Sequence, residues 1–266
     1  MSADKKPTAL ITGASYGIGA ELARIFAREG YDLILTARSG EKLRKQAEIL
    51  KNTSDVQVNC IVSDLSCPGA GTLLFEEVMR LGLEPEVLVN NAGVGLHGFF
   101  IKNNPARVLD MIRLNVLTLS ELTHLFLPGM LARRRGGILN VASTAAFQPG
   151  PLMAVYYATK AYVLSFTEAL HYELKGSGLK ISTLCPGPTR SHFQENAGIG
   201  HVAIFTYASM EASTVAEAGY RGFVKGKSVV IPGLLNKCMA FSVRFTPRWL
   251  IPMVVHRLQE ERQKTR

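Results

Sequence analysis

The sequence predicts an α/β fold built on one parallel, doubly wound sheet of seven strands. Short apolar runs alternate with longer amphipathic segments along most of the chain. Several of these runs are continuously apolar, which is typical of strands buried on both faces. The 266 residues suffice for one large domain, and no linker or internal repeat divides them. Right-handed crossovers would then place helices on both faces of the sheet.

The expected elements follow one another in a regular strand–helix order. We expect strands at residues 8–12, 32–37, 56–62, 86–91, 137–142, 180–185 and 228–232. We expect helices near residues 17–29, 40–52, 69–82, 104–135, 155–175 and 210–225. This order predicts a single domain over residues 1–233, followed by an apolar and basic extension over residues 234–266.

Composition excludes several classes of function. The formal net charge of +9 favours anionic ligands or surfaces, but no basic block is interleaved with aromatic residues, so we expect no nucleic-acid partner. The four cysteines form no C-x-x-C pair, and the six histidines form no metal-binding motif, so we expect no metal. The chain starts without an apolar leader segment, which favours the cytoplasm.

A glycine-rich stretch, Thr12 to Gly19, follows the first expected strand and opens the first helix. Gly13 permits a tight turn, while Gly17 and Gly19 let backbone and helix approach a pyrophosphate closely. The helix N-terminus then offers free N–H groups and a positive dipole to the phosphates. We therefore predict a dinucleotide site here, and the other expected cofactor contacts within the turn are Ser15, Tyr16 and Ile18.

The end of the second strand bears on the choice of cofactor. Sites for NAD usually carry an acid there, which holds the ribose 2′-hydroxyl. This sequence has Arg38 in that region. A guanidinium suits a 2′-phosphate through charge-assisted hydrogen bonds, so we expect NADP(H) to be favoured over NAD(H).

Six motifs in one order show a family resemblance. The chain resembles the short-chain dehydrogenases/reductases (SDR family), of the single-domain type of about 250 residues, over residues 7–233. The motifs are the T-G-x-x-x-G-x-G turn, NNAG at 90–93, Asn115, Ser143, the Y-x-x-x-K of Tyr156 and Lys160, and PG at 186–187. The resemblance implies a Rossmann-type sheet and a hydride-transferring oxidoreductase.

The resemblance also implies further cofactor contacts. Those expected near the adenine and its ribose are Asp64, Leu65, Asn90, Ala92 and Gly93. The turn after the sixth strand would cap the nicotinamide, with contacts expected from Pro186, Gly187 and Thr189. Related sequences often carry a threonine two residues beyond Thr189, where this chain has Ser191.

Two adjacent tyrosines are candidates for the proton donor of such a reaction. Tyr156 and Lys160 are spaced i, i+4, so they share a helix face, and an ammonium close to a phenol lowers its pKa. Tyr157 is spaced i, i+3 from the same lysine, so spacing alone leaves both tyrosines as candidates for the proton donor. The resemblance selects Tyr156 and leaves Tyr157 as a packing residue. It also implies that Ser143, which precedes Tyr156 by 13 residues, holds the substrate oxygen.

The resemblance assigns roles to two further polar side chains. Lys160 would bind the ribose hydroxyls of the nicotinamide half and would thus also be a cofactor contact. Asn115, in the long helical region, would hold a water that connects Lys160 to solvent. A buried polar residue in a helix kink is a compatible second interpretation of Asn115.

Substrate selection is expected from the least regular segments, residues 95–100, 144–153 and 191–207. Their bulky side chains would form an apolar pocket for a hydrophobic ketone, aldehyde or alcohol, and equally could pack against the core. These side chains are Phe147, Met153, Phe193 and Phe205.

The extension and the long helices bear on partners. Residues 234–266 mix apolar, aromatic and basic residues without a run long enough to span a bilayer. The extension could pack on the domain, on a neighbouring subunit or on a membrane surface, and between the last two we favour the subunit. Helices 104–135 and 155–175 would join subunits into a homodimer or homotetramer, as the resemblance implies.

The sequence thus predicts an NADP(H)-dependent oxidoreductase that acts on a carbonyl or secondary alcohol. A second hypothesis is a catalytically idle dinucleotide-binding sensor on the same fold, because fold alone proves no activity. The complete set of Asn115, Ser143, Tyr156 and Lys160 argues against the sensor. A lyase or epimerase is disfavoured because a second C-terminal domain is missing.

Overall fold

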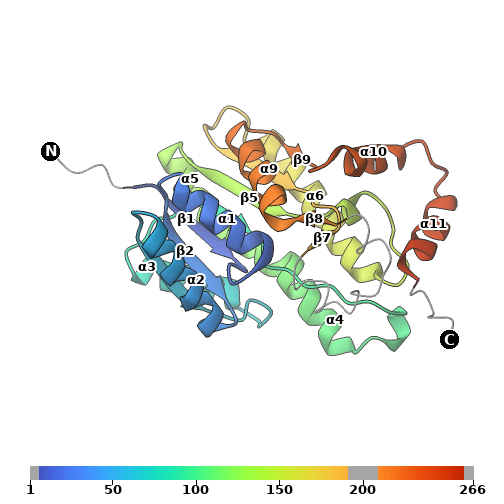
Figure 1. Cartoon of the computed structure of the whole chain (residues 1–266), viewed down its shortest axis with the longest axis horizontal. Helices are drawn as coiled ribbons and strands as arrows, with labels where there is room; N and C mark the ends of the chain where they lie inside the picture. The colour runs from blue at the N-terminus through green and yellow to red at the C-terminus, as the bar shows by residue number, and fades with distance from the viewer. Residues whose placement is uncertain (1–5, 191–208, 261–266) are drawn as a thin grey trace.

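The computed structural model describes residues 6–190 and 209–260, and its centre is a parallel sheet of seven strands in the order β3-β2-β1-β4-β5-β6-β9 (Figure 1). The strands are β1 (Thr8–Thr12), β2 (Asp32–Ala37), β3 (Val58–Val62), β4 (Val87–Asn90), β5 (Gly137–Val141), β6 (Lys180–Leu184) and β9 (Val229–Val230). The predicted Rossmann-type sheet is thereby confirmed. The chain reverses its direction of travel across the sheet between β3 and β4, which pair with β2 and β1 respectively. Ligands of such sheets bind where the order reverses, at the carboxyl ends of the strands.

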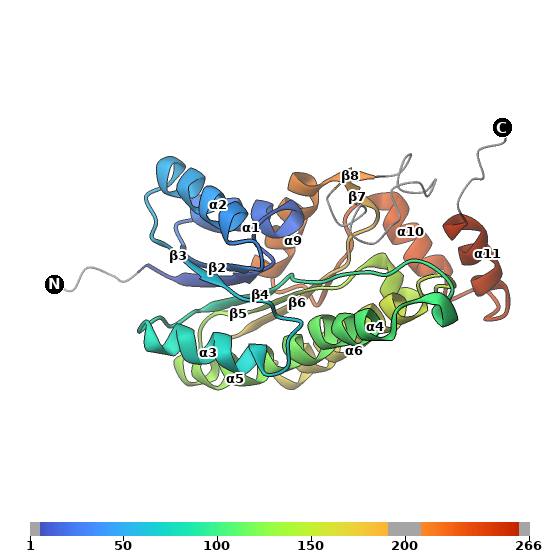
Figure 2. The same cartoon turned by 90° about the horizontal axis from the view of Figure 1, so that it is seen from below.

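Helices cover both faces of the sheet (Figure 2). On one face lie α1 (Gly17–Arg28), α2 (Gly40–Thr53) and α9 (Ala212–Val224); on the other lie α3 (Ala70–Arg80), α5 (Leu119–Arg133) and α6 (Ala154–Glu173). Successive strand residues point to opposite faces and supply two separate cores. Ile11 and Leu35 belong to the core under α1, whereas Leu10 and Ile34 belong to the core against α3 and α5. Burial on both sides explains the continuous apolar runs.

The long helical region expected at 104–135 is interrupted. Asn104 caps α4 (Pro105–Ile112) by accepting a hydrogen bond from Ala106 N at 2.9 Å. A π-helical turn, η2 (Arg113–Thr118), then joins α4 to α5 and contains Asn115. Such turns often mark functional sites because they re-aim a side chain within a helix.

Short elements complete the carboxyl edge of the sheet. They are the 3-10 helices η1 (Phe100–Lys102) and η3 (Thr144–Phe147), and the two-residue strands β7 (Thr189–Arg190) and β8 (Met210–Glu211), which pair with each other. Within residues 6–190 and 209–260, no helix is both long enough and apolar enough to cross a membrane.

The C-terminal extension forms two helices, α10 (Leu234–Ser242) and α11 (Leu250–Gln259), at the end of the molecule opposite the N-terminus (Figure 2). Ile251 and Val255 of α11 are buried against Met111, Met153 and the tyrosines of α6. The described part of the extension therefore packs on its own domain.

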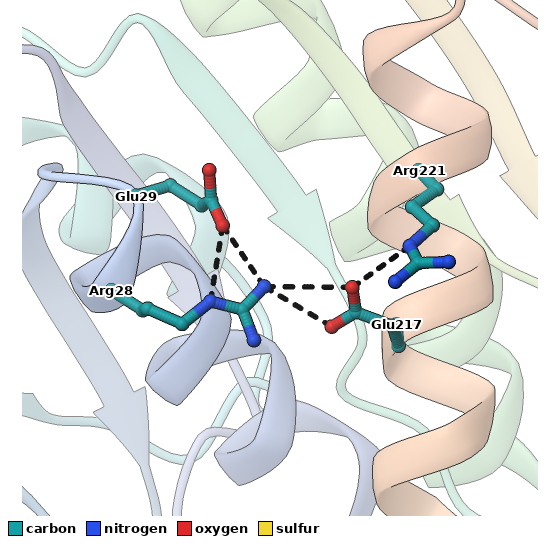
Figure 3. Close-up of polar contacts among 4 residues, drawn as sticks. All are labelled: Arg28, Glu29, Glu217 and Arg221. Carbon is teal, nitrogen blue, oxygen red and sulfur yellow. Dashed lines mark hydrogen bonds and ion pairs between the residues drawn. The ribbon is translucent and has the colours of Figure 1, made fainter.

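An ion-pair cluster joins α1 to α9 on the surface (Figure 3). Arg28 Nη2 lies 3.2 Å from Glu217 Oε2 and 2.9 Å from Glu29 Oε1, while Arg221 Nε lies 2.9 Å from Glu217 Oε1. These groups are largely solvated, so the cluster contributes little free energy and chiefly fixes how the two helices lie side by side.

Candidate active site

A cavity of about 590 Å³ lies at the carboxyl edge of the sheet. The glycine-rich turn and the end of β2 line its outer part, and Ser143, Tyr156 and Lys160 line its inner part. Residues of α10 and α11 form a further wall. The cavity therefore brings together most of the residues that the sequence singled out, from segments far apart in the chain.

The turn after β1 requires glycine at two positions. Gly13 has φ +66°, and a Cβ there would lie 2.9 Å from Ala92 Cα. A Cβ on Gly19 would lie 2.4 Å from Gly13 O, so helix α1 closes tightly onto the turn. Asn91 Nδ2 fixes the same turn by donating to Thr12 O at 2.9 Å and Gly13 O at 3.1 Å. The backbone at the start of α1 is thereby left open to a phosphate group, which fits a dinucleotide.

Two cationic side chains, Arg38 and Lys42, line the outer end of the cavity. Asp64 faces this end; burial acts to raise its pKa, but hydrogen bonds from Ser66 and the charge of Arg38 together hold the pKa below its usual range. Ser66 donates to Asp64 Oδ1 from its backbone N at 3.0 Å and from its Oγ at 2.6 Å. The cations and the fixed carboxylate suit the phosphate, ribose and adenine end of a nucleotide.

Ser143, Tyr156 and Lys160 meet at the inner end. Ser143 lies directly before η3, and its Oγ accepts from Ala145 N at 3.1 Å, which orients the hydroxyl. The Ser143 hydroxyl also donates to Pro186 O at 3.4 Å, and it lies close enough to the Tyr156 phenol to act to lower the phenol pKa. Lys160 Nζ lies 5.9 Å from the centroid of the Tyr156 ring and donates to Val141 O at 2.8 Å. A phenol, a hydroxyl and an amine thus line the same part of the cavity.

Burial is the main influence on the pKa values of Tyr156 and Lys160. Burial raises the pKa of Tyr156 far above its ordinary value of 10.0, although the Ser143 hydroxyl opposes the rise. Burial also lowers the pKa of Lys160 to about 8. Both shifts have the same cause, because desolvation disfavours the charged form of each group.

Asn115 is held at the π turn by main-chain bonds. Its Oδ1 accepts from Val94 N at 3.0 Å, and its Nδ2 donates to Val94 O at 2.9 Å and to Thr159 Oγ1 at 3.1 Å. A Cβ on Gly93 would lie 3.3 Å from both Asn115 Oδ1 and Lys160 Nζ, so these groups are neighbours. Asn115 itself does not line the cavity. Both interpretations of Asn115, a kink residue and a support for Lys160, suit this placement.

Most of the predicted cofactor contacts line the cavity, but two do not. The lining includes Gly13, Ser15, Tyr16, Gly17, Ile18, Arg38, Asp64, Leu65, Ala92, Gly93, Tyr156, Lys160, Pro186, Gly187 and Thr189. Gly19 lies behind the turn. Asn90 is buried between strands, where its Nδ2 donates to Asn140 Oδ1 at 2.9 Å and Thr123 Oγ1 at 3.2 Å. The neighbouring Asn91 lines the cavity instead.

The predicted substrate segments contribute unevenly. Within 144–153, the residues that line the cavity are Thr144, Ala145, Gln148 and Met153. Phe147 instead packs against a core cluster that includes Val163. From 95–100, no residue lines the cavity, although the adjacent Val94 does. The whole of the third segment, 191–207, lies outside the described residues, and with it Ser191, Phe193 and Phe205.

Sequence reasoning missed the wall that the C-terminal extension contributes. Ile251, Val255 and Gln259 recur at i, i+4 and i+8, face inward and line the cavity. That spacing was the available signal for an inward face on this segment. Close contact at α10 supports the placement, because a Cβ on Gly187 would lie 2.4 Å from Asn236 Oδ1.

This arrangement defines a class of protein. A parallel sheet with a glycine turn at its switch point and a Ser, Tyr and Lys group beyond it is the layout of a dinucleotide-binding oxidoreductase. A protein-family model described as short chain dehydrogenase matches residues 7–217. The chain belongs to the short-chain dehydrogenase/reductase family.

Curated relatives extend beyond the matched part. The chain is 34% identical over 180 residues to hydroxysteroid dehydrogenase-like protein 1 of Gallus gallus, and 34% identical over 184 residues to very-long-chain 3-oxoacyl-CoA reductase of Rattus norvegicus. Each match covers 67% of this chain, but only 54% and 58% of the respective relative. The chain therefore spans little more than half the length of these relatives.

Solved structures match over nearly the whole chain. A short-chain dehydrogenase from Sphingobium yanoikuyae in complex with NADPH is 33% identical with a TM-score of 0.80, covering 90% of this chain and 93% of its own. A bulky-bulky ketone specific alcohol dehydrogenase from Comamonas testosteroni is 28% identical with a TM-score of 0.76, covering 91% of this chain and 95% of its own.

Proposed function

We propose that this protein transfers a hydride between NADP(H) and a carbonyl or secondary alcohol of a hydrophobic substrate, with Tyr156 as general acid and base. The observation that supports this most is that Ser143, Tyr156 and Lys160 line one cavity, with Lys160 Nζ 5.9 Å from the centroid of the Tyr156 ring. This group lies in the same cavity as the glycine turn. One ligand-sized space thus contains both a dinucleotide cradle and a proton donor.

Each side chain has a distinct task in this proposal. When bound, NADP(H) supplies or accepts the hydride. Tyr156 gives its proton to the carbonyl oxygen during reduction, and its raised pKa keeps the phenol protonated for that step. Ser143 holds the oxygen as negative charge develops. Lys160 binds ribose hydroxyls and stabilises the phenolate, and Asn115 supports the water through which the proton is replaced.

The preference for NADP(H) is proposed from Arg38 and Lys42. Both line the outer end of the cavity, and no ion pair involves either one within the described residues. A 2′-phosphate there would gain charge-assisted hydrogen bonds that a 2′-hydroxyl lacks. The NADPH complex of the Sphingobium relative supports this choice, although another similar structure holds NAD.

A hydrophobic substrate is proposed from the inner walls. Met153, Ile251 and Val255 are buried around the tyrosines of α6. The names of two similar proteins, a 3-oxoacyl-CoA reductase and a bulky ketone dehydrogenase, support a bulky carbonyl compound.

The test is NADPH consumption across a panel of carbonyl compounds, followed at its absorbance band. We expect turnover of bulky apolar ketones with NADPH and much slower turnover with NADH. The proposal would be contradicted if calorimetry shows that the protein binds NADPH but no compound on the panel is reduced.

The second candidate is an idle dinucleotide-binding protein. It is favoured by one relative, the inactive hydroxysteroid dehydrogenase-like protein 1 of Homo sapiens, which is 33% identical over 180 residues. The joint presence of Ser143, Tyr156 and Lys160 in one cavity favours the enzyme, because a binding protein needs no proton donor. Cofactor binding without turnover would favour the sensor.

Subunit association is proposed through the outward faces of α5 and α6. Tyr162 and Tyr172 of α6 are exposed, as is Leu117 of the π turn that leads into α5. Burying these apolar groups would favour a homodimer or homotetramer. Light scattering would decide: a monomeric mass at micromolar concentration contradicts the proposal.

We also propose that the protein resides in the reducing cytoplasm, where its four cysteines would remain free thiols as in the structure. These are Cys60, Cys67, Cys185 and Cys238.

A further inference from the structure

Gln259 leaves a buried hydrogen-bond acceptor without a partner inside the cavity. It ends α11, is only 4% exposed and belongs to the cavity lining. Its Nε2 donates to the Tyr157 hydroxyl at 2.7 Å. Its Oε1 has no hydrogen-bond partner in the structure. Buried polar atoms are rarely left unpaired, so an unpaired acceptor in a ligand cavity indicates a group that a ligand satisfies.

Tyr157 offers the complementary donor. Its oxygen accepts from Gln259, so its own O–H hydrogen is available to a ligand. The ring is fixed in place, because a Cβ on Gly150 would lie 2.3 Å from it. Its centroid lies 6.1 Å from that of Tyr156. The donor and acceptor therefore form a fixed pair in the same cavity as Tyr156.

The surroundings of this pair are apolar. Met153, Ile251 and Val255 pack around Tyr157, and Val243 lies against the same cluster. The Tyr157–Gln259 pair is thus a polar spot in an apolar wall. A hydroxyl group both donates and accepts, so it satisfies the pair in either orientation of the Gln259 carboxamide.

We propose that Tyr157 and Gln259 bind a second oxygen function of the substrate, a hydroxyl on the part of the substrate that lies against α11. The substrate class is then a bulky hydroxy ketone or the corresponding diol. The proposal rests on the proposed function for the identity of the reacting group, but binding of the hydroxyl can be measured without turnover.

The test compares β-tetralone with its ring-hydroxylated derivatives. Calorimetry with NADPH present measures affinity, and NADPH consumption measures turnover. We expect the best hydroxylated derivative to bind about tenfold more tightly than β-tetralone, as one well-placed buried hydrogen-bond pair implies. Gln259→Met and Tyr157→Phe should each reduce this preference to about twofold or less, while the affinity for β-tetralone stays within about twofold.

A matched control comes from Gln46, which is buried but does not line the cavity. Gln46→Met should keep the wild-type preference. Equal affinity for all these ligands, absence of binding, or a preference that survives Gln259→Met would overturn the subsite. Preferential binding without turnover would support the subsite and contradict the proposed function, so the two failures are distinguishable.

A different observation concerns the outer face of α10–α11, defined as the exposed side chains of residues 234–257. Leu234, Phe241, Phe245 and Trp249 are each more than half exposed. Lys237, Arg244, Arg248 and Arg257 are also exposed, and residues 234–257 contain no acid. None of these four cations takes part in an ion pair among the described residues.

The chemistry of this face identifies its occupant. Exposed aromatic groups interspersed with basic groups suit the interface of an anionic bilayer, where rings insert and cations meet lipid headgroups. A second copy paired by a two-fold axis would set the face against itself, with cations against cations. We infer that the outer face of α10–α11 docks on an anionic membrane surface. The helices that would touch the bilayer also form a wall of the apolar cavity.

Flotation of the full chain with lipid vesicles tests this inference. We expect binding to vesicles of phosphatidylcholine with phosphatidylserine, weakened by salt, and little binding to phosphatidylcholine alone. Phe245→Ser with Trp249→Ser should reduce binding at least about tenfold, as loss of two inserted rings implies. Leu73→Ser is the control, because Leu73 of α3 is also more than half exposed and lies outside α10 and α11. No binding, or equal binding by the double variant, would overturn the inference, as would a double variant that only changes oligomer size.

Discussion

The buried amine of Lys160 should cost the folded protein free energy at neutral pH. Burial lowers its pKa from the ordinary 10.5 to about 8. At ~1.4 kcal/mol per pH unit, this difference corresponds to ~3 kcal/mol against folding. Well below pH 8 both folded and unfolded chains carry the proton, so the whole cost applies. Between about pH 8 and pH 10.5 the unfolded chain binds more protons, so stability rises as this cost is lost.

Lys160→Met removes this titration while keeping an unbranched side chain. From about pH 7 to about pH 9.5, wild type should gain ~2 kcal/mol in unfolding free energy relative to the variant. Urea unfolding without cofactor measures both proteins, and groups that titrate in both cancel. Lys45→Met, at an exposed lysine of α2, should behave like wild type. Parallel stability–pH curves for wild type and Lys160→Met would refute the reasoning.

Three further predictions concern cofactor choice, the extension and pH. Arg38→Ala should lower the ratio of kcat/KM with NADPH to kcat/KM with NADH at least about tenfold, because a charge-assisted phosphate contact is lost. An unchanged ratio would mean that the 2′-phosphate binds elsewhere. Gly187→Ala should lower the unfolding free energy, measured in urea, by about 1–3 kcal/mol, because the added methyl group presses on Asn236. Gly129→Ala in α5 is the control and should have no such effect. Equal effects of the two substitutions would contradict the contact between Gly187 and Asn236. The rate of carbonyl reduction should decline above about pH 8, as Lys160 loses its proton. The rate of alcohol oxidation should rise with pH, because burial raises the pKa of Tyr156 and the phenolate that acts as base forms only at higher pH. A reduction rate that rises above about pH 8 would contradict these roles.

The sheet was predictable because periodicity reports burial directly. All seven strands begin and end within two residues of the expected positions, since runs such as 32–37 are buried on both faces and allow no other element. β9 is shortened most: it shrinks from the expected 228–232 to Val229–Val230 at the edge of the sheet, where only β6 pairs with it. Edge strands receive less support from neighbours, so their ends are poorly specified by sequence.

The site was only partly predictable, because sequence motifs do not specify which atom of a motif faces the ligand. Asn90 and Asn91 are adjacent amides, yet Asn90 joins buried strands while Asn91 lines the cavity. The spacing in α11 indicates an inward face, but the partner of that face, seen in the contact of Gln259 with Tyr157, is long-range and is not encoded locally. The same contact changes the interpretation of Tyr157 from a packing residue to a candidate substrate contact.

The most direct test of the central claim is a comparison of Tyr156→Phe with Tyr157→Phe. Turnover of β-tetralone with NADPH, and NADPH binding by calorimetry, would be measured for both. Tyr156→Phe should lose turnover by at least about a thousandfold while it still binds NADPH, because the proton donor is removed and the cradle is not. Tyr157→Phe should keep turnover within about tenfold. A Tyr156→Phe variant that loses only a few-fold, or a Tyr157→Phe variant that is the inactive one, would contradict the assignment of Tyr156 as the proton donor.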